Sequence, residues 1–347
     1  MISICLIHAM ITSPIFALSS AEELWTGLVP RYRIHDSIFL AESVGGDSNP
    51  SQPMFNWGIG VTLSAENSLA KLDSSRKSRL TQVLMMCERY WNPQGPVPGF
   101  DVLPDKKGDQ DRYFDDNAWM VMALVDSYEI TRDPRWLKSA EASLTYVLSG
   151  EDDKLGGGIY WKEREKTSKN TCSNGPAAAA CLAVYRNSKN PQHLAKAQQI
   201  YSWTKAKLLA PDGLYWDNIR LDGSLDKTQW SYNSALMLRT AKELAQITGK
   251  SVYCEDAEKL ESACIKRWVK ADGTIDDELQ FAHLLFENLD PKNFDAKGCV
   301  SKLLEGRNSA GFFGTRWGKT SEGKHQIIHQ ASAVRALATY ELLRRRK

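Results

Sequence analysis

The sequence lacks the short patterns that would assign a chemistry directly. It contains no HExxH or GxSxG pattern, and its glycine run at residues 156–158 lacks the lysine and Ser/Thr of a phosphate-binding loop. The seven cysteines show no CxxC spacing and no paired histidine, so we expect buried thiols and no metal site. Alternating strand patterns are nearly absent, which favours an all-helical fold.

Neither sign of charge is in large excess. The chain has 44 Lys and Arg against 42 Asp and Glu, and its one basic cluster, residues 344–347, lies at the C-terminal end. We therefore expect no nucleic-acid partner. With 347 residues, 42% of them hydrophobic and 25% charged, the composition predicts a globular protein with a large core, which we expect to be monomeric.

Residues 1–21 contain no charged side chain and end in small residues, with Ser19 and Ala21 placed before a possible cut at Glu22. This pattern resembles a secretory signal, so we predict a signal peptide at 1–21, a single domain at 22–347, and a secreted or periplasmic location. The stretch is broken by Pro14 and is a poor membrane span, and the charged C-terminus does not match a lipid-anchor signal. We expect no membrane anchor.

A repeat of about 57 residues organises the middle of the chain. Asn117, Asn174 and Asn233 each precede a small residue and an apolar run, and sixteen residues later each copy has a turn residue. Within a copy the first helix is apolar nearly all round and the second is one-sided, so buried helices alternate with surface helices. Six such hairpins would fill the chain, which predicts an (α/α)6 toroid.

The other hairpins have weaker patterns. We predict them at residues 55–72 with 79–91, 277–289 with 294–304, and 326–343 with a partner drawn from residues 22–42.

Asp115 and Asp116 stand at the entrance to the first clear helix of this repeat. Two adjacent carboxyl groups cannot both ionise freely, so one can act as a proton donor beside an anionic neighbour, as retaining glycoside hydrolysis requires. The alternative is helix capping, for which Asp is well suited. A second pair, Asp276 and Asp277, also precedes an apolar stretch, and we interpret it as capping or loop residues. In such a toroid the inner helices all begin at one rim, so the residues at their starts converge on one central cleft. This convergence favours a catalytic role for Asp115 and Asp116.

Aromatic and polar residues occupy the segments that enter these helices. Aromatic rings stack on the apolar faces of sugars while amides and carboxylates bond the hydroxyls, so this inventory suits a carbohydrate cleft. The alternative is that the rings only plug the end of the barrel. The predicted substrate-binding residues are Trp57, Tyr113, Asn117, Trp161, Asn174, Trp216, Asp217, Tyr232 and Asn233.

Four blocks of the sequence resemble glycoside hydrolase family 76, the α-1,6-mannanase family. They are DRYFDDNAWMVMALVDSYEITRDPRWL (111–137), GGGIYWKEREKTSKNTCSNGPAAAACLAVY (156–185), the segment 213–249 with GLYWDNI and WSYNSALMLRTAKELAQITG, and HQASAVRALA (329–338). The resemblance implies an (α/α)6 fold and a retaining, endo-acting hydrolase of α-1,6-linked mannan that needs no cofactor. It places Asp115 as the nucleophile and Asp116 as the acid/base. The stretch 276–289 departs from the family pattern, and we expect it to line one end of the cleft.

Two other classes of function stay open on the sequence alone. Another six-hairpin enzyme, such as an unsaturated glucuronyl hydrolase or a sugar epimerase, would use differently placed residues; for an epimerase the candidates are His283, His325 and His329, which we interpret as structural. The other class is a glycan-binding or transglycosylating wall-assembly protein on the same scaffold, because a fold does not fix a function.

Overall fold

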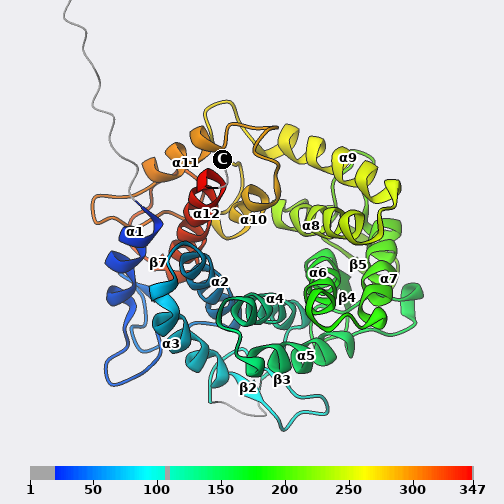
Figure 1. The fold of residues 1–347 in the computed structure, drawn as a ribbon, viewed down its shortest axis with the longest axis horizontal. Helices are drawn as coiled ribbons and strands as arrows, with labels where there is room; N and C mark the ends of the chain where they lie inside the picture. Colours follow the sequence, from blue (N-terminus) through cyan, green and yellow to red (C-terminus); the bar gives the residue numbers. More distant parts are fainter. Residues whose placement is uncertain (1–19, 106–109, 346–347) are drawn as a thin grey trace, which may run out of the picture.

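A computed structural model describes residues 20–105 and 110–345, and its helices form two concentric rings (Figure 1). The inner ring comprises α2 (Asn56–Leu72), α4 (Phe114–Thr131), α6 (Thr171–Ser188), α8 (Ser231–Thr248), α10 (Leu279–Asn288) and α12 (Ile327–Arg345). The outer ring comprises α1 (Ala21–Leu28), α3 (Lys77–Glu88), α5 (Pro134–Leu148), α7 (Pro191–Leu208), α9 (Ser251–Trp268) and α11 (Ala296–Glu305).

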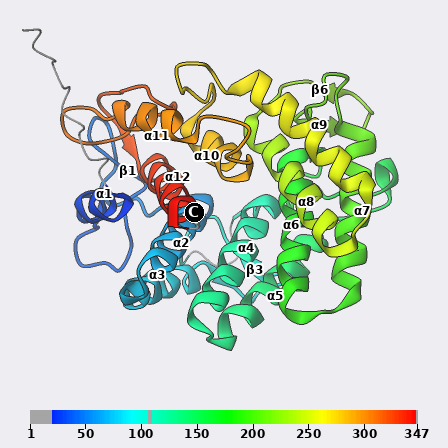
Figure 2. The ribbon, with the colours of Figure 1, turned by 45° about the horizontal axis from the view of Figure 1, so that its top comes forward.

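Each inner helix packs against the next one along the ring, and α12 packs against α2 to close it (Figure 2). The predicted (α/α)6 toroid is therefore confirmed. The sixth hairpin joins the two ends of the chain, because α1 is the outer helix that packs most extensively on α12. The predicted partner from residues 22–42 is thus α1, which ends at Leu28 and passes into a short 3-10 helix at Val29–Tyr32.

The three clear copies of the repeat begin their inner helices at residues 114, 171 and 231. Each inner helix ends on a residue in the left-handed conformation, Arg132, Lys189 or Gly249. In the first two copies the side chain of Asp133 or Asn190 then caps the outer helix, whose first residue is a proline. Helix end, cap and proline thus fix a tight turn from local sequence alone.

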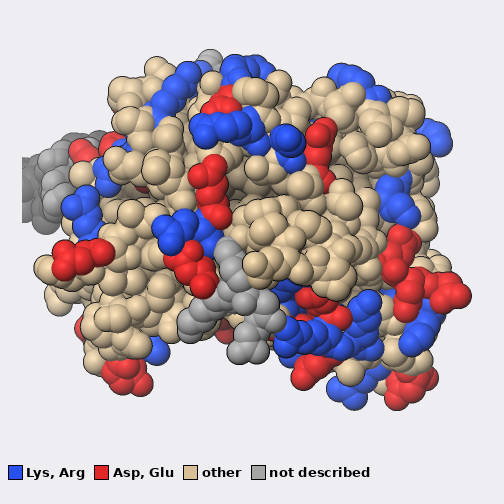
Figure 3. Space-filling model, turned by 90° about the horizontal axis from the view of Figure 1, so that it is seen from below, with Lys and Arg blue, Asp and Glu red and all other residues tan. Residues whose placement is uncertain are grey.

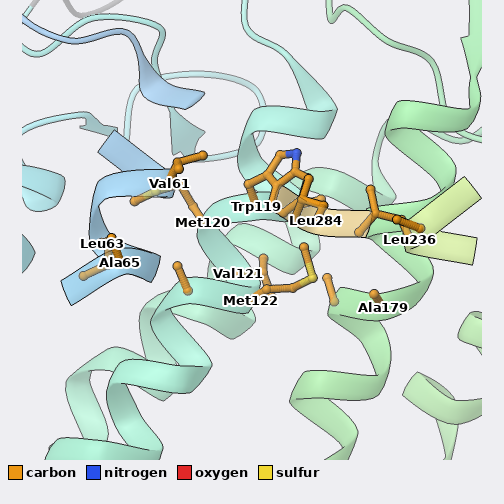
Figure 4. Close-up of a cluster of buried hydrophobic side chains, with 14 of the residues drawn as sticks. Val61, Leu63, Ala65, Trp119, Met120, Val121, Met122, Ala179, Leu236 and Leu284 are labelled. Atoms are coloured by element: carbon orange, nitrogen blue, oxygen red, sulfur yellow. The ribbon is translucent and has the colours of Figure 1, made fainter. Parts of the chain in front are cut away.

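The core fills the middle of the inner ring. Figure 4 shows side chains from α2, α4, α6, α8 and α10 converging there, including Val61, Met120, Ala179, Leu236 and Leu284, all fully buried or nearly so. In α6 every residue from 171 to 184 is buried, and its alanines allow the neighbouring helices to approach closely. The toroid is therefore packed solid below its mouth rather than open as a tunnel.

Ion pairs join the inner helices at the end remote from their N-termini. Lys71 of α2 lies 3.3 Å from Asp126 of α4, Arg186 of α6 lies 3.2 Å from Glu243 of α8, and Arg335 of α12 lies 2.7 Å from Glu287 of α10. These pairs are only partly exposed, so each charge needs its partner.

Short antiparallel strands decorate the segments between helices. β1 (Ser43–Val44) pairs with β7 (His325–Gln326), β2 (Trp91–Asn92) with β3 (Gly99–Phe100), and β4 (Ser168–Asn170) with β5 (Asn218–Arg220), which also pairs with β6 (Leu225–Asp226). The last of these sheets fixes the loops that enter α6 and α8 relative to each other, with Asn170 opposite Asn218.

The predicted signal peptide lies outside the described residues except for Ser20 and Ala21. Ser20 forms a capping box with Glu23 at the start of α1, and the N–H of Ala21 donates to Glu341 of α12 at 2.7 Å. The boundary at residue 22 stays a prediction.

Three further properties concern the described residues. Their helices include none with the length and apolar character that crossing a membrane requires. Of their six cysteines, all free thiols, five are buried and Cys254 is exposed. Figure 3 shows Lys and Arg interspersed with Asp and Glu over one face, in keeping with the near-zero net charge.

Candidate active site

A cleft of about 810 Å³ opens where the inner helices begin. Its lining comes from the N-terminal ends of α2, α4, α6, α8 and α10, and from the loops and strands that lead into them. A volume of this size lies within the range of about 300–1,000 Å³ that is usual for ligand sites. The cleft therefore sits at the rim that the repeat predicts.

Asp115 and Asp116 lie in the first turn of α4 and both line the cleft. Neither is the N-cap, which is Tyr113 and makes no side-chain capping bond. Oδ1 of Asp115 accepts the backbone N–H of Asp116 at 3.0 Å, and Oδ2 accepts the indole N–H of Trp161, also at 3.0 Å. The capping interpretation of the pair thus does not describe their geometry.

The two carboxyl groups have different electrostatic surroundings. Burial raises the pKa of Asp115 to about 7, against the opposing effect of its hydrogen bonds. Burial also raises the pKa of Asp116, and the charge of Asp115 raises it further. Both groups lie at the positive end of the α4 dipole, but Asp115 also has the hydrogen bonds, so the first negative charge is best placed there. Between the two ionisations the pair carries one negative charge.

Trp161 reaches Asp115 because two backbone contacts tie its loop to the start of α4. The N–H of Phe114 donates to the carbonyl of Trp161 at 3.0 Å, and Tyr113 and Lys162 form an isolated β-bridge. The Trp161 ring packs edge-on against Tyr113 with centroids 5.3 Å apart. The backbone contacts of this loop therefore hold the Trp161 ring in its position beside Asp115.

Asp217 is another carboxylate of the cleft, and two amides hold it. Asn218 donates to Oδ2 at 2.8 Å and Asn233 donates to Oδ1 at 3.2 Å. Burial raises the pKa of Asp217 despite these bonds. The backbone carbonyl of Asp217 also accepts the N–H of Thr171, which locks this loop to the start of α6.

The structure brings seven of the eleven predicted site residues into the cleft lining and leaves four outside it. Those in the lining are Trp57, Tyr113, Asp115, Asp116, Trp161, Asp217 and Tyr232. The others are Asn117, Asn174, Trp216 and Asn233.

The expectation that the repeated asparagines converge on the cleft needs correction. Asn117 is fully buried and its amide bonds both the N–H and the carbonyl of Phe100, while Asn174 does the same for Ile159. Both side chains hold the segment that precedes their helix, so nothing remains for a ligand. Asn233 acts through Asp217, and Trp216 lies under Lys227, 5.3 Å from its ring centre.

The cleft also contains residues that sequence reasoning did not select. Cys172 faces it beside Asp115 and Tyr232, although the sequence suggested only a buried thiol. Phe281 lies in the stretch 276–289, which was expected to line one end of the cleft, and it does so. Arg220 enters from β5. For Cys172 the only available signal was its place two residues before the repeated Asn174.

The second Asp pair and the three candidate histidines lie outside the cleft lining. Asp276 is a surface residue that pairs with Arg316 at 3.1 Å, and Asp277 is buried and accepts the N–H of Ser231 at 2.7 Å. His283, His325 and His329 are buried and absent from the cleft lining. Burial lowers the pKa of His329 to about 4, so it stays neutral near pH 7. The structural interpretation of all five is in keeping with these positions.

Comparison with known protein families decides the kinship of the chain. The model of glycosyl hydrolase family 76 matches residues 48–339, which is most of the sequence. The chain belongs to glycosyl hydrolase family 76. The predicted resemblance is therefore confirmed. Membership of this family excludes the two alternative six-hairpin enzymes, the unsaturated glucuronyl hydrolase and the sugar epimerase.

Relatives in family 76 are distant. Mannan endo-1,6-alpha-mannosidase DCW1 of Saccharomyces cerevisiae is 28% identical over 156 residues, which are 40% of this chain and 35% of that protein. The matched region thus spans about a third of the yeast relative.

Solved family 76 structures match more completely. The GH76 alpha-mannanase BT2949 of Bacteroides thetaiotaomicron superposes with a TM-score of 0.87 at 25% identity, covering 94% of this chain and 96% of that one. An inactive variant of the alpha-1,6-mannanase GH76A of Salegentibacter sp. HEL1_6, with two consecutive aspartates changed to asparagine, is known in complex with alpha-1,6-mannotriose. It superposes with a TM-score of 0.78 at 25% identity, covering 93% and 98% of the two chains.

Proposed function

We propose that this protein is a retaining, endo-acting glycoside hydrolase that cleaves α-1,6-mannosidic linkages in mannan. The observation that carries the proposal is the position of Asp115 and Asp116, which lie side by side in the cleft at the first turn of α4. The sequence contains three Asp-Asp pairs, at residues 115–116, 152–153 and 276–277, and only the first lines the cleft.

The surroundings of the pair support a division of the two roles. Asp115 accepts two hydrogen bonds and is the better anion, so it attacks the anomeric carbon while the glycosidic bond breaks. Asp116 keeps its proton because of burial and its charged neighbour, so it protonates the departing glycosidic oxygen. In the second step Asp116 takes a proton from water, which attacks the anomeric carbon and releases Asp115 from the covalent intermediate.

Two features of the relatives support the substrate and the pair. The Salegentibacter α-1,6-mannanase is described as inactive when two consecutive aspartates are replaced, and that variant holds an α-1,6-linked trisaccharide. The yeast relative is named for cleavage of the same linkage. The aromatic and amide-bearing lining of the present cleft suits a neutral sugar chain.

The deciding experiment is incubation of the purified protein with linear α-1,6-linked manno-oligosaccharides, with product size and the first anomer followed by NMR. Internal cleavage with the α-anomer released first is the expected result. Release of the β-anomer would contradict the retaining mechanism, and formation of longer products would identify a transglycosylase. Binding without any reaction would identify a glycan-binding protein.

The roles have their own test with an activated α-mannoside and azide. We expect azide to restore glycosyl transfer to the Asp116→Ala variant, because a small anion can replace water without needing a general base. The product then keeps the α configuration. Rescue of Asp115→Ala with an α-configured azide product would reverse the two assignments, whereas a β-configured product from that variant would mean that azide had replaced Asp115 as the nucleophile.

The location of the protein also stays a proposal. A secreted or periplasmic enzyme would meet mannan outside the cell, in keeping with the uncharged segment 1–21. N-terminal sequencing of the exported protein tests this, and a retained residue 1 would contradict it.

A further inference from the structure

One end of the cleft is closed by aromatic rings that come from opposite parts of the inner ring. Trp57 is the second residue of α2 and Tyr232 the second residue of α8, and two inner helices separate α2 from α8 in either direction around the toroid. Their ring centroids nevertheless lie only 6.4 Å apart. The two side chains therefore meet across the mouth of the toroid.

Phe281 of α10 completes this contact. Its ring stacks on Tyr232 with centroids 4.4 Å apart and planes at 14°, and on Trp57 with centroids 5.7 Å apart and planes at 22°. Trp230 packs against it from the segment before α8, at 5.3 Å. We call these four residues the aromatic cluster: Trp57, Trp230, Tyr232 and Phe281.

The aromatic cluster divides the mouth into two parts. On one side lie Asp115 and Asp116 of α4 and the lining from α6 and β5, whereas no described residue of α11 or α12 lines the cleft. The lining that lies toward α6 and β5 is polar and includes Lys162, Glu165 and Arg220. The cleft thus runs from a polar side, past the carboxylate pair, to an aromatic wall.

We propose that Phe281 is a specificity-determining residue that fixes the last sugar unit the cleft accommodates on the aromatic side. The inference rests on the proposed function. Phe281 is half-buried, with its ring supported by three others, so a glycan cannot displace it without breaking stacked contacts on several elements. The chain must leave the cleft at this wall, whereas it can continue on the polar side.

The test is the position of the cut in a ladder of linear α-1,6-manno-oligosaccharides of increasing length. Hydrolysis in H₂¹⁸O marks the new reducing end, so mass spectrometry reports which bond breaks. The wild-type protein is expected to cut at a fixed distance from one end, and Phe281→Ala is expected to move the preferred cut by one unit. The share of cleavage at the original bond should fall about three- to tenfold, as expected for the loss of one aromatic stack.

Matched variants keep this test decisive. Phe281→Leu retains most of the volume but not the flat ring, and it is expected to shift the cut in the same direction if Phe281→Ala fails to fold. Phe294→Ala is the control, because Phe294 is also half-buried and packs on Phe286 of α10, 5.7 Å away, but lies outside the cleft. Its cleavage pattern should equal that of the wild type. An unchanged pattern in both Phe281 variants would overturn the inference while leaving the proposed function intact.

A wild-type protein that cuts none of the oligosaccharides would instead contradict the proposed function. In that case calorimetry of the same oligosaccharides binding to the protein tests separately whether the aromatic cluster limits the length that the cleft accommodates. Affinity should stop increasing at a certain length, and Phe281→Ala should extend that length by one unit. An identical plateau in both proteins, or no binding at all, would overturn the inference.

Discussion

The indole N–H of Trp161 donates a hydrogen bond to Oδ2 of Asp115 across 3.0 Å, from a loop 46 residues further along the chain. The carboxyl of Asp116 has no such donor among the side-chain hydrogen bonds of the described residues. Together with the backbone N–H of Asp116, this tryptophan thus distinguishes two carboxyl groups that are neighbours in sequence.

Replacing Trp161 by Phe should move the acidic limb of the pH profile of kcat/KM to higher pH. The lost bond favours the charged form of Asp115, so its removal raises the pKa of that group, and a larger fraction of the protein then carries a protonated nucleophile at a given acidic pH. We expect a loss of about 3- to 30-fold at pH 6 that shrinks as the pH rises. A uniform loss at every pH would instead indicate that Trp161 acts only in binding.

The carboxylate pair itself should be essential. Asp115→Asn and Asp116→Asn are each expected to lower kcat on α-1,6-manno-oligosaccharides by about 10³-fold or more, because one removes the nucleophile and the other the proton donor. Circular dichroism spectra should stay those of the wild type. Asp276→Asn is the control, since that carboxylate belongs to a surface ion-pair cluster, and it should keep near-normal activity. Substantial turnover by either of the first two variants would end the assignment.

The contrast between predicted and observed roles is clearest for the repeated asparagines. The sequence predicted the helices of the repeat because left-handed helix ends, capping Asp or Asn and proline are local signals. It also placed Asn117 and Asn174 in the site, and here it failed. A polar side chain at a helix start can face either a ligand or the backbone of the preceding segment. The path of that segment decides between the two, and no local sequence pattern encodes this path.

Phe281 and Cys172 illustrate the same limit from the other direction. Each enters the cleft because two distant helices are adjacent in the closed ring. A ten-residue helix such as α10 has too few turns for periodicity to show which face points inward. The aspartates could be selected because adjacent carboxyls at a helix start are a chemical pattern as well as a structural one.

Asn117→Ala should destabilise the fold rather than alter catalysis directly. The substitution leaves the buried N–H and carbonyl of Phe100 without their partner, at a cost of about 2–4 kcal/mol in the free energy of unfolding. Urea titration followed by tryptophan fluorescence measures this. Asn293→Ala, at an exposed position, should change stability by no more than about 0.5 kcal/mol. Equal stabilities for the two variants would show that the Asn117 bonds contribute nothing.

Asp116→Asn should stabilise the protein at neutral pH, since the folded state raises the pKa of Asp116 above its usual value of 3.8. Between pH 4 and the folded-state pKa the native protein binds more protons than the unfolded chain, so the group destabilises the fold progressively as the pH rises through that window. Removing the charge removes this cost. The variant should melt about 2–6 °C higher than the wild type at pH 8, and the difference should shrink as the pH falls and vanish below about pH 3, where the carboxyl is protonated in both the folded and the unfolded state. Asp276→Asn should show the opposite sign, because ion pairs lower the pKa of Asp276 and its contribution is lost as the pH falls. An equal gain for Asp116→Asn at high and at low pH would mean that packing, and not the crowded charge, is the cause. The wild-type pair would then ionise without penalty. In that case the division of roles between Asp115 and Asp116 would lose its electrostatic basis.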